Sequence, residues 1–171
     1  MRSAARPSRL PAKTERAESM QAEIRNAHAE DLSSIQRITE RAYAVWLPVL
    51  GFAPLPVVED YAPRIARGEV RVACEHGEVT GLIVVESHDG HDLIFNVAVD
   101  PDHAGGGLGS RLIADAERHA KANGKCCIKL YTNALMSRNI AFYLKLGYVE
   151  TDRRPHPSRA GSTIVDMAKS L

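Results

Sequence analysis

Three consecutive glycines, with a fourth two positions further on, constrain this chain more than any other feature. The run is Gly105-Gly106-Gly107-Leu108-Gly109, and an apolar stretch from Leu93 to Val99 precedes it. After the run, apolar residues recur at helical spacing up to Asn123-Gly124, a pair typical of a helix end. A strand, a glycine loop and a helix in this order place unhindered backbone N–H groups at the positive end of a helix dipole. The sequence therefore predicts a binding site for a diphosphate.

Spacing separates this loop from two other phosphate-binding motifs. A P-loop has Lys directly after its last glycine, whereas here Ser110 follows Gly109. A dinucleotide fingerprint counted from Gly105 needs glycine at position 110 and an acid at the end of the next strand, near Tyr131, where none stands. A glycine-rich connection that binds nothing is the remaining alternative, and the length of the run disfavours it.

Alternation and helical spacing predict the other elements. Before the glycine run we expect strands at 22–26, 70–75, 79–86 and 93–99, and helices at 32–45 and 57–66 separated by a Pro-rich connection, 48–56. After it we expect the helix that starts at the glycines, a strand at 126–131, a helix ending at Gly147, and strands at 148–153 and 163–168. This order predicts an α/β fold, an α+β mixed sheet with helices on both faces.

Composition excludes several classes of protein. With 22 Lys and Arg against 21 Asp and Glu, the net charge of +1 gives no electrostatic basis for binding nucleic acid. No apolar run approaches the roughly 20 residues needed to cross a membrane. The three cysteines and seven histidines lack the spacing of disulfide frameworks or metal sites. We therefore expect reduced thiols, no metal and a cytoplasmic protein.

The first 19 residues differ from the rest of the chain. They are rich in Arg and lack both a core pattern and the apolar stretch of a secretory signal. We expect a disordered extension at 1–19 and a single domain at 20–171. A transit peptide would also fit, but a start site assigned upstream of Met20 explains the segment more simply.

Two segments of the chain resemble the GNAT N-acetyltransferase superfamily. In that family a strand ending in Val-x-Pro is followed by Gln or Arg, two variable residues, Gly, one variable residue, and Gly or Ala. Gly107 and Gly109 match the two glycines, while Ala104 stands where the family has Gln or Arg. A second signature, a Tyr four residues before a Gly-aromatic pair, matches Tyr143 and Gly147-Tyr148.

The resemblance implies a GNAT-like fold with acetyl-CoA as co-substrate. In such a fold the mostly antiparallel sheet splays between two parallel strands, and the pantetheine arm of the coenzyme pairs with exposed strand backbone. Asn139 precedes Tyr143 by one helical turn, so the two side chains should share a face. From that face the Asn139 amide could hydrogen-bond to the pantetheine or the phosphates of the coenzyme. Asn133 is an alternative for this contact, although a role in a turn or as a helix N-cap suits it equally. The residues expected to bind the coenzyme are Val97, Ala98, Val99, Gly105, Gly106, Gly107, Leu108, Gly109, Ser110 and Asn139.

Acyl transfer to an amine needs a proton donor for the leaving thiolate, and Tyr143 resembles the general acid of the family. A phenol with a pKa of about 10 stays protonated at neutral pH and can donate to sulfur. A packing role is the alternative for this residue. Negative charge developing on the carbonyl oxygen would be stabilised by backbone N–H groups around 97–99.

A general base is harder to assign. The acids of the predicted sheet are Glu75, Glu78, Glu86 and Asp92, and Glu86 is our choice among them. A chain of water molecules could remove the proton instead, because part of any amine is already neutral at physiological pH. A dedicated base is therefore optional in this prediction.

The acceptor is expected between the N-terminal helices and the end of the sheet, where this family binds it. Tyr43, Trp46, Phe52 and Tyr61 fall there, and we assign Tyr43 and Trp46 to substrate binding because aromatic rings can hold an amine by cation–π contact. These rings could equally be core residues under the Pro-rich connection. A basic segment, 153–159, should form a hairpin loop beside the substrate entrance or simply carry solvated charge.

The sequence thus predicts an N-acetyltransferase that acts on a small-molecule amine or on a peptide or protein amine, as a monomer or homodimer. A non-catalytic acyl-CoA sensor with the same fold is the alternative, because Ala104 departs from the family pattern and no base is evident. Neither prediction involves nucleic acid or a membrane.

Overall fold

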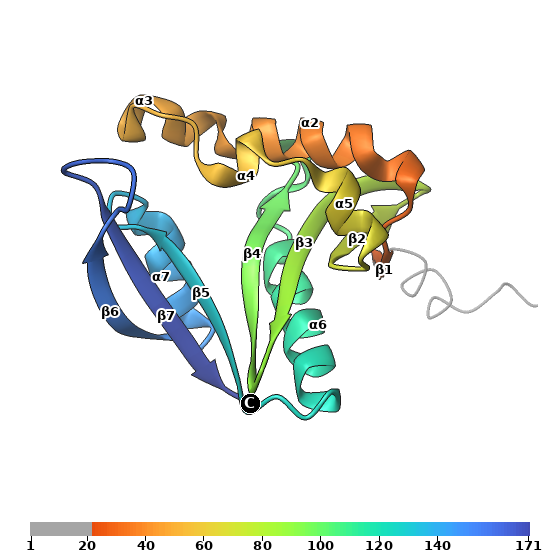
Figure 1. Ribbon diagram of the computed structural model, residues 1–171. Helices are drawn as coiled ribbons and strands as arrows, with labels where there is room; N and C mark the ends of the chain where they lie inside the picture. The colour runs from red at the N-terminus through yellow and green to blue at the C-terminus, as the bar shows by residue number, and fades with distance from the viewer. Residues whose placement is uncertain (1–21) are drawn as a thin grey trace, which may run out of the picture.

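The computed structural model describes residues 22–171, in which seven strands form a single mixed sheet (Figure 1). Their order is β1-β2-β3-β4-β5-β7-β6. The pair β4 and β5 is parallel, and the other neighbouring pairs are antiparallel. This confirms the predicted α/β class with a mixed, mostly antiparallel sheet. The strands are β1 (Glu23–Asn26), β2 (Val70–Glu75), β3 (Glu78–His88), β4 (His91–Val99), β5 (Cys127–Asn133), β6 (Val149–Pro155) and β7 (Thr163–Ser170).

Helices cover both faces of the sheet, as expected. One cluster of buried apolar residues lies beneath α2 and α5, and another lies on the opposite face beneath α6 and α7. Figure 1 shows α2, α4 and α5 above the strands β3 and β4, with α3 extending toward β5 to β7; α6 lies beside β3 and β4, and α7 lies beside β5 and β7. The helices are α2 (Leu32–Tyr43), α3 (Leu47–Leu50), α4 (Leu55–Val58), α5 (Tyr61–Ala66), α6 (Leu108–Ala122) and α7 (Ser137–Lys145).

Two helices differ from the sequence prediction. The helix expected at 32–45 ends at Tyr43 and continues through a 3₁₀ turn into α3. The helix expected at 57–66 is two short helices, because the chain is extended at Asp60. Asp60 caps α5 by accepting a hydrogen bond from the Ala62 N–H at 3.1 Å. The Pro-rich connection is more helical than expected because proline is well tolerated in the first turn of a helix.

The sheet opens between its two parallel strands. β4 and β5 pair from His91 and Cys127 up to Ile94 and Leu130, and beyond these residues they diverge (Figure 1). β3 continues beside β4 as far as Val99, and β7 continues beside β5 to the end of that strand. Each arm of the resulting V is supported on its outer side, while its inner edge has no strand partner within residues 22–171.

The divergence begins at a β-bulge in β4. Ile94 and Asn96 pair with consecutive residues of β3, which leaves Phe95 as an extra residue. A bulge bends its strand and increases the local twist. It also shifts the alternation of side chains, because Ile94 belongs to the cluster beneath α6 whereas Ala98 belongs to the cluster beneath α2. Residues four apart in an unbroken strand would share a face.

Ion pairs fix the end of β4, where the glycine loop begins. Asp100 is buried, and its carboxylate accepts hydrogen bonds from Arg41 at 2.6 and 2.8 Å and from Arg37 at 3.2 Å. Burial alone would raise the pKa of Asp100, but the backbone N–H of Asp102 and the two arginines outweigh burial and lower that pKa. These contacts attach α2 to the residue that precedes the loop.

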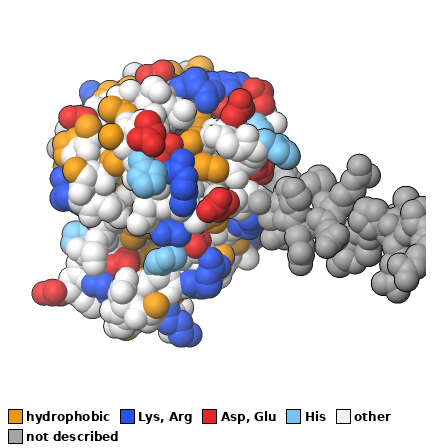
Figure 2. Space-filling model, turned by 90° about the vertical axis from the view of Figure 1, so that its right-hand side faces the viewer, with side chains coloured by type: hydrophobic (Ala, Val, Ile, Leu, Met, Phe, Trp, Pro, Cys, Tyr) orange, Lys and Arg blue, Asp and Glu red, His pale blue; other side chains and the backbone are white. Residues whose placement is uncertain are grey.

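The surface carries charges of both signs. Figure 2 shows Lys and Arg interspersed with Asp and Glu on the face that it presents. Within the described part of the chain, no helix combines the length and the apolarity that crossing a bilayer requires. The same residues contain no group of three or more His, Cys, Asp or Glu placed to hold a metal ion. The expectations for residues 1–19 and for a start at Met20 lie outside the described residues.

Candidate active site

The glycine loop presents bare backbone at the start of α6. Gly105 and Gly107 have φ angles of +86° and +79°, a region that residues with side chains rarely adopt. A methyl group placed on Gly105, Gly106 or Gly107 would meet no atom within 4 Å, so this backbone faces open space. No backbone carbonyl of residues 22–171 accepts a hydrogen bond from these three N–H groups. The loop therefore has the free donors and the clearance that an anion needs.

The first turn of α6 adds further donors beside the opening of the sheet. The N–H groups of residues 108–110 precede the first hydrogen bond of the helix, which Arg111 donates at 3.1 Å. A methyl group on Gly109 would lie 3.5 Å from Phe142 of α7 and 3.8 Å from Val99 of β4. The start of α6 is thus in close contact with both α7 and the strand that borders the opening.

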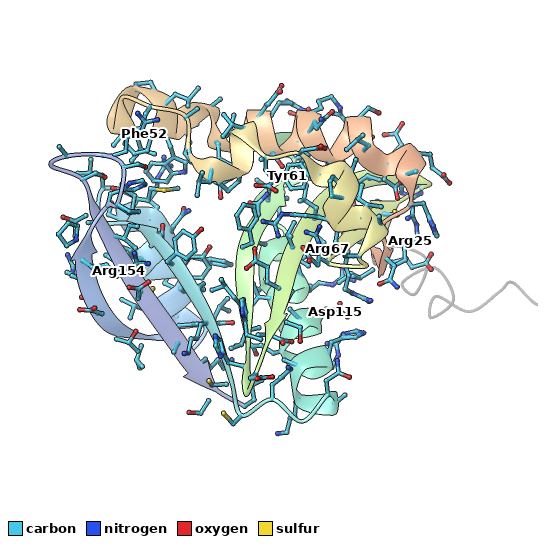
Figure 3. All side chains as sticks on the ribbon, viewed as in Figure 1. Arg25, Phe52, Tyr61, Arg67, Asp115 and Arg154 are labelled. Atoms are coloured by element: carbon cyan, nitrogen blue, oxygen red, sulfur yellow. The ribbon has the colours of Figure 1, made fainter. Side chains whose placement is uncertain are left out.

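A cavity of about 220 Å³ lies in the opening between β4 and β5. Its walls come from α2, residues between 50 and 58 in and directly after the Pro-rich connection (hereafter the Pro-rich segment), the diverging parts of β4 and β5, α7, and the hairpin loop between β6 and β7. Figure 3 shows Phe52, one of the lining residues, where the Pro-rich segment approaches this hairpin loop. Four of the predicted site residues line the cavity together: Tyr43, Val97, Asn139 and Tyr143.

Tyr143 contributes a buried phenol to this cavity. The residue is 8% exposed, and burial raises its pKa to about 12. Its ring packs against Phe142 and Tyr148, with centroid distances of 5.5 and 6.0 Å. Its hydroxyl makes no hydrogen bond to any residue of the described chain, in contrast to the hydroxyls of Tyr43 and Tyr61. The phenol is therefore protonated at neutral pH and its proton is available to a ligand.

Tyr43, on the wall formed by α2, belongs to a hydrogen-bond network. Its hydroxyl donates to Asn96 Oδ1 at 3.1 Å, and burial raises its pKa well above the usual range. The Asn96 amide donates to the hydroxyls of Tyr61 at 2.9 Å and Thr39 at 3.4 Å. The Tyr61 hydroxyl donates to the Pro56 carbonyl at 2.7 Å. The network connects α2 and the Pro-rich segment to β4, and the proton of Tyr43 is already engaged.

The residues predicted as the general base and as one of the two substrate contacts lie away from the cavity lining. Glu86, chosen as the base, accepts a hydrogen bond from Arg64 at 2.8 Å and lies 3.4 Å from His88 Nε2. Trp46, chosen for substrate binding, is buried, and the Arg138 guanidinium lies 5.0 Å from its ring centre. Phe52 lines the cavity with Tyr43, whereas Tyr61 is a core residue, 1% exposed.

The predicted coenzyme-binding residues occupy two places. Val97 lines the cavity, and Ala98 is buried in the cluster beneath α2. The glycine loop and the start of α6 lie outside the cavity lining and border the opening from the side of α7. Asn133 lines the cavity and also makes the turn that was considered for it, because its Oδ1 accepts from the Leu135 N–H at 3.0 Å.

The sequence interpretation assigns no role to one contributor to the cavity and leaves another open. Asn96 was part of a motif but was given no role, although a polar residue inside an apolar strand was an available signal. The basic segment forms the hairpin expected beside the substrate entrance, whereas solvated charge is the other interpretation of its side chains. His156, Ser158 and Arg159 from its loop line the cavity.

Comparisons with known proteins agree with this geometry. A sheet split between two parallel strands beside a glycine-capped helix defines the GNAT class of folds, and residues 66–150 match the family model described as an acetyltransferase (GNAT) domain. The structure is similar to ribosomal-protein-S18-alanine N-acetyltransferase from Escherichia coli, with a TM-score of 0.71, 22% identity, and coverage of 87% of this chain and 93% of that one. On the strength of the family model, the chain belongs to the GNAT acetyltransferase family, and the similarity to solved structures concerns the fold.

Two further relatives show how far the similarity extends. PaiA N-acetyltransferase from Thermoplasma acidophilum, solved in complex with coenzyme A, has a TM-score of 0.73 and 20% identity, and the match covers 89% of this chain and all of that one. The IAA acetyltransferase of Azospirillum brasilense is 32% identical over 95 residues, which are 53% of this chain and 61% of that protein. The match thus spans less than two thirds of this relative's length.

Proposed function

We propose that this chain is an N-acetyltransferase that transfers the acetyl group of acetyl-CoA to a primary amine. Three features that meet at one opening in the sheet carry the proposal. They are the free N–H groups of the glycine loop, the unpaired inner edges of β4 and β5, and the unpartnered hydroxyl of Tyr143. Family membership supports it, and so does the coenzyme A complex of the similar PaiA enzyme.

In this proposal, the main chain holds the donor. The N–H groups of residues 105–110 would bind the diphosphate of the coenzyme, favoured by the dipole of the fifteen-residue helix α6. Ala104 supplies no side-chain donor, so this binding depends on backbone conformation. The inner edge of β4 around Val97 would pair with the pantetheine arm, and Asn139 would hydrogen-bond to it from α7.

Transfer forms a bond between the amine nitrogen and the acetyl carbon, breaks the carbon–sulfur bond, and moves one proton from nitrogen to sulfur. Backbone N–H groups near Val97 would stabilise the negative charge that develops on the carbonyl oxygen. The leaving thiolate is a weaker base than the Tyr143 phenolate, because a thiol has a pKa of about 8.5 and Tyr143 one of about 12. Tyr143 would therefore stabilise the sulfur by donating a hydrogen bond. It would transfer its proton to the sulfur only if the phenolate received another proton at the same time.

No dedicated base is required in this proposal. In the described chain the cavity lining includes no Asp or Glu, and Arg64 engages the Glu86 carboxylate. The amine would enter in its neutral form or lose its proton to solvent, since a fraction of any amine is neutral at physiological pH. Glu86 remains the candidate for a general base if its substitution strongly lowers turnover.

Thiol release measured with a panel of primary amines tests the proposal. We expect acetyl-CoA to be cleaved faster when a suitable amine is present, with the N-acetylated product detected by mass spectrometry. A protein that binds coenzyme A in calorimetry but shows no amine-dependent cleavage would be the acyl-CoA sensor. A folded protein that gives no binding heat with the coenzyme would contradict both functions.

A further inference from the structure

The hairpin loop between β6 and β7 carries polar side chains into the cavity on a fixed backbone. The His156 N–H donates to the Ser162 carbonyl at 2.9 Å, and the Ser162 N–H donates to the Arg159 carbonyl at 3.1 Å. Asn133 of β5 donates to Ser162 Oγ at 2.7 Å. The loop is thus cross-linked internally and attached to the neighbouring arm of the sheet.

His156 presents a hydrogen-bond donor from this loop. Its Nδ1 accepts a hydrogen bond from the Ser158 backbone N–H at 3.2 Å. In the neutral imidazole the proton is then on Nε2, which becomes the donor. The ring meets Phe52 edge-on with centroids 5.8 Å apart, which fixes its orientation beside the cavity.

Arg159 differs from the other two arginines of the same hairpin. Arg153 pairs with Glu150 at 2.6 Å and Arg154 with Asp166 at 2.6 Å, so their charges are compensated within the hairpin. Figure 3 shows Arg154 on the strands and Phe52 beside the loop. No carboxylate of residues 22–171 lies within ion-pair distance of Arg159, and its guanidinium is 4.9 Å from the Phe52 ring centre. Its charge is therefore available to a ligand in the cavity.

The cavity has no negative charge to match this arginine. Among the described residues that line it, none is Asp or Glu, and most of the remaining lining is apolar. An acceptor carrying a second positive charge would meet Arg159 without a compensating carboxylate, which is unfavourable in a cavity partly shielded from water. An acceptor with a carboxylate would meet a guanidinium, which binds carboxylates through two parallel hydrogen bonds.

We propose that the loop of residues 156–159 binds a carboxylate on the acceptor, so that the acceptor is an apolar amino acid or a similar small molecule. This inference rests on the proposed function, whose amine it specifies. Arg159 would bind the carboxylate, with His156 Nε2–H and the Ser158 hydroxyl as further donors. The apolar side chain of the acceptor would lie against Phe52 and the Pro-rich segment.

Matched acceptors test this inference: apolar amino acids such as leucine and phenylalanine, their primary amides, and the amines that lack the carboxyl group. We expect kcat/KM for each acid to exceed that for its amide by about tenfold or more, the loss expected when a charged hydrogen bond is missing. At pH 8 the amide has the larger fraction of neutral amine, so amine reactivity alone would favour the amide over the acid. Equal use of acids and amides would overturn the inference, with the acetyltransferase function intact.

Variants of the hairpin arginines supply the control. Arg159→Ala should lower kcat/KM for the acids by about 10- to 100-fold and leave the amides little changed, while Arg159→Lys should retain part of the preference. Arg153→Ala removes an equal charge outside the cavity and should change neither. An equal loss for acids and amides in Arg159→Ala would mean that Arg159 only supports the loop, which contradicts the inference.

Binding measurements separate this inference from the reaction itself. Calorimetry with protein saturated with coenzyme A should detect leucine or phenylalanine and give weaker heats with the matching amide. Preference for the acid without turnover would support the carboxylate site and contradict the proposed transfer. Binding of coenzyme A without binding of any acid would overturn the carboxylate site.

Discussion

The two sides of the opening offer a ligand different kinds of contact. On the side of the glycine loop, the available groups are main-chain N–H groups at residues 105–110, where the side chains are small or missing except for Leu108, which is buried in the core. On the side of the Pro-rich segment and the hairpin loop, side chains such as Tyr43, Phe52 and Arg159 form the wall. Contacts of the first kind depend on backbone conformation at consecutive positions. Contacts of the second kind depend on residues brought together from separate segments, so the two sides should respond differently to substitution.

A substitution in the glycine loop should have the largest effect. Gly107→Val places a β-branched residue at φ +79°, which costs about 1–3 kcal/mol in strain and puts a side chain where the diphosphate would lie. We expect coenzyme A binding, measured by calorimetry, to weaken at least 100-fold, taking about 1.4 kcal/mol for each tenfold. Gly90→Val is the matched control, because Gly90 has φ +75° in the turn before β4, far from the loop. If Gly90→Val weakened binding equally, the loop would have no special role.

Replacing one tyrosine and then the other should distinguish the two walls of the cavity. Tyr143→Phe removes the unpartnered hydroxyl, and we expect turnover to fall by about 100-fold, the scale of a positioned proton donor, with coenzyme affinity nearly unchanged. Tyr43→Phe removes the donor to Asn96 and should lower turnover much less. Steady-state kinetics measures turnover, and calorimetry measures coenzyme affinity. A larger loss of turnover in Tyr43→Phe than in Tyr143→Phe would contradict the role assigned to Tyr143.

The dependence of turnover on pH should reflect the burial of Tyr143. Because the pKa of Tyr143 is raised to about 12, its hydroxyl keeps its proton at every pH below that value. Turnover at saturating substrate should therefore show no fall caused by this residue as pH rises from 8 to about 10, the pKa of an unperturbed phenol. A decline near pH 10 that disappears in Tyr143→Phe would contradict the raised pKa.

The anchor at the end of β4 should affect stability more than chemistry. Asp100→Asn removes the charge that Arg41 and Arg37 bind, and we expect the free energy of unfolding to fall by about 2 kcal/mol, as for hydrogen bonds to charged groups. The pKa of Asp100 is lowered, so its contribution is complete above the unfolded pKa near 3.9 and is lost as pH falls through the folded value. Urea unfolding at pH 7 and at low pH measures both effects. Asp102→Asn, at an exposed position with one ion pair, should have a smaller effect.

The smallest change is expected at Glu86. A general base contributes about 10²- to 10⁴-fold to turnover, so its loss would be unmistakable. Glu86→Gln should leave turnover nearly unchanged, because Arg64 engages this carboxylate outside the cavity and has Glu59 and Glu69 as further partners. A loss of 100-fold in steady-state turnover would restore Glu86 as the base.

The glycine-loop side of the opening could be predicted from the sequence because its determinants are local. Glycine spacing between a strand and a helix indicates a loop conformation, and the structure shows that conformation at Gly105 and Gly107. The strands and α6 followed from alternation and helical spacing. The bulge at Phe95 could not be found this way, because one extra residue in an apolar strand leaves no mark in its composition. The opening of the sheet was therefore available only through the family resemblance.

The side of the Pro-rich segment and the hairpin loop was harder to predict, because its residues come from separate segments of the chain. Trp46 and Tyr61 have the residue type expected of an amine site, yet one packs beneath Arg138 and the other is buried in the core. Arg159 was indistinguishable in sequence from Arg153 and Arg154, and only the placement of Glu150 and Asp166 separates the three. Glu150 lies three residues before Arg153 on the same strand, whereas Asp166 is brought to Arg154 by the pairing of β6 with β7, which a single sequence does not specify.

The bulge in β4 also has a consequence for how enzymes of this shape can diversify. The width of the aperture is set where the backbones of β4 and β5 part, and the Pro-rich segment and the hairpin loop lie outside these two strands. Exchanges in the Pro-rich segment or the hairpin loop can then change which amine is accepted while the coenzyme stays in the same position. New acceptor ranges could thus arise through a few surface substitutions, without any rebuilding of the sheet.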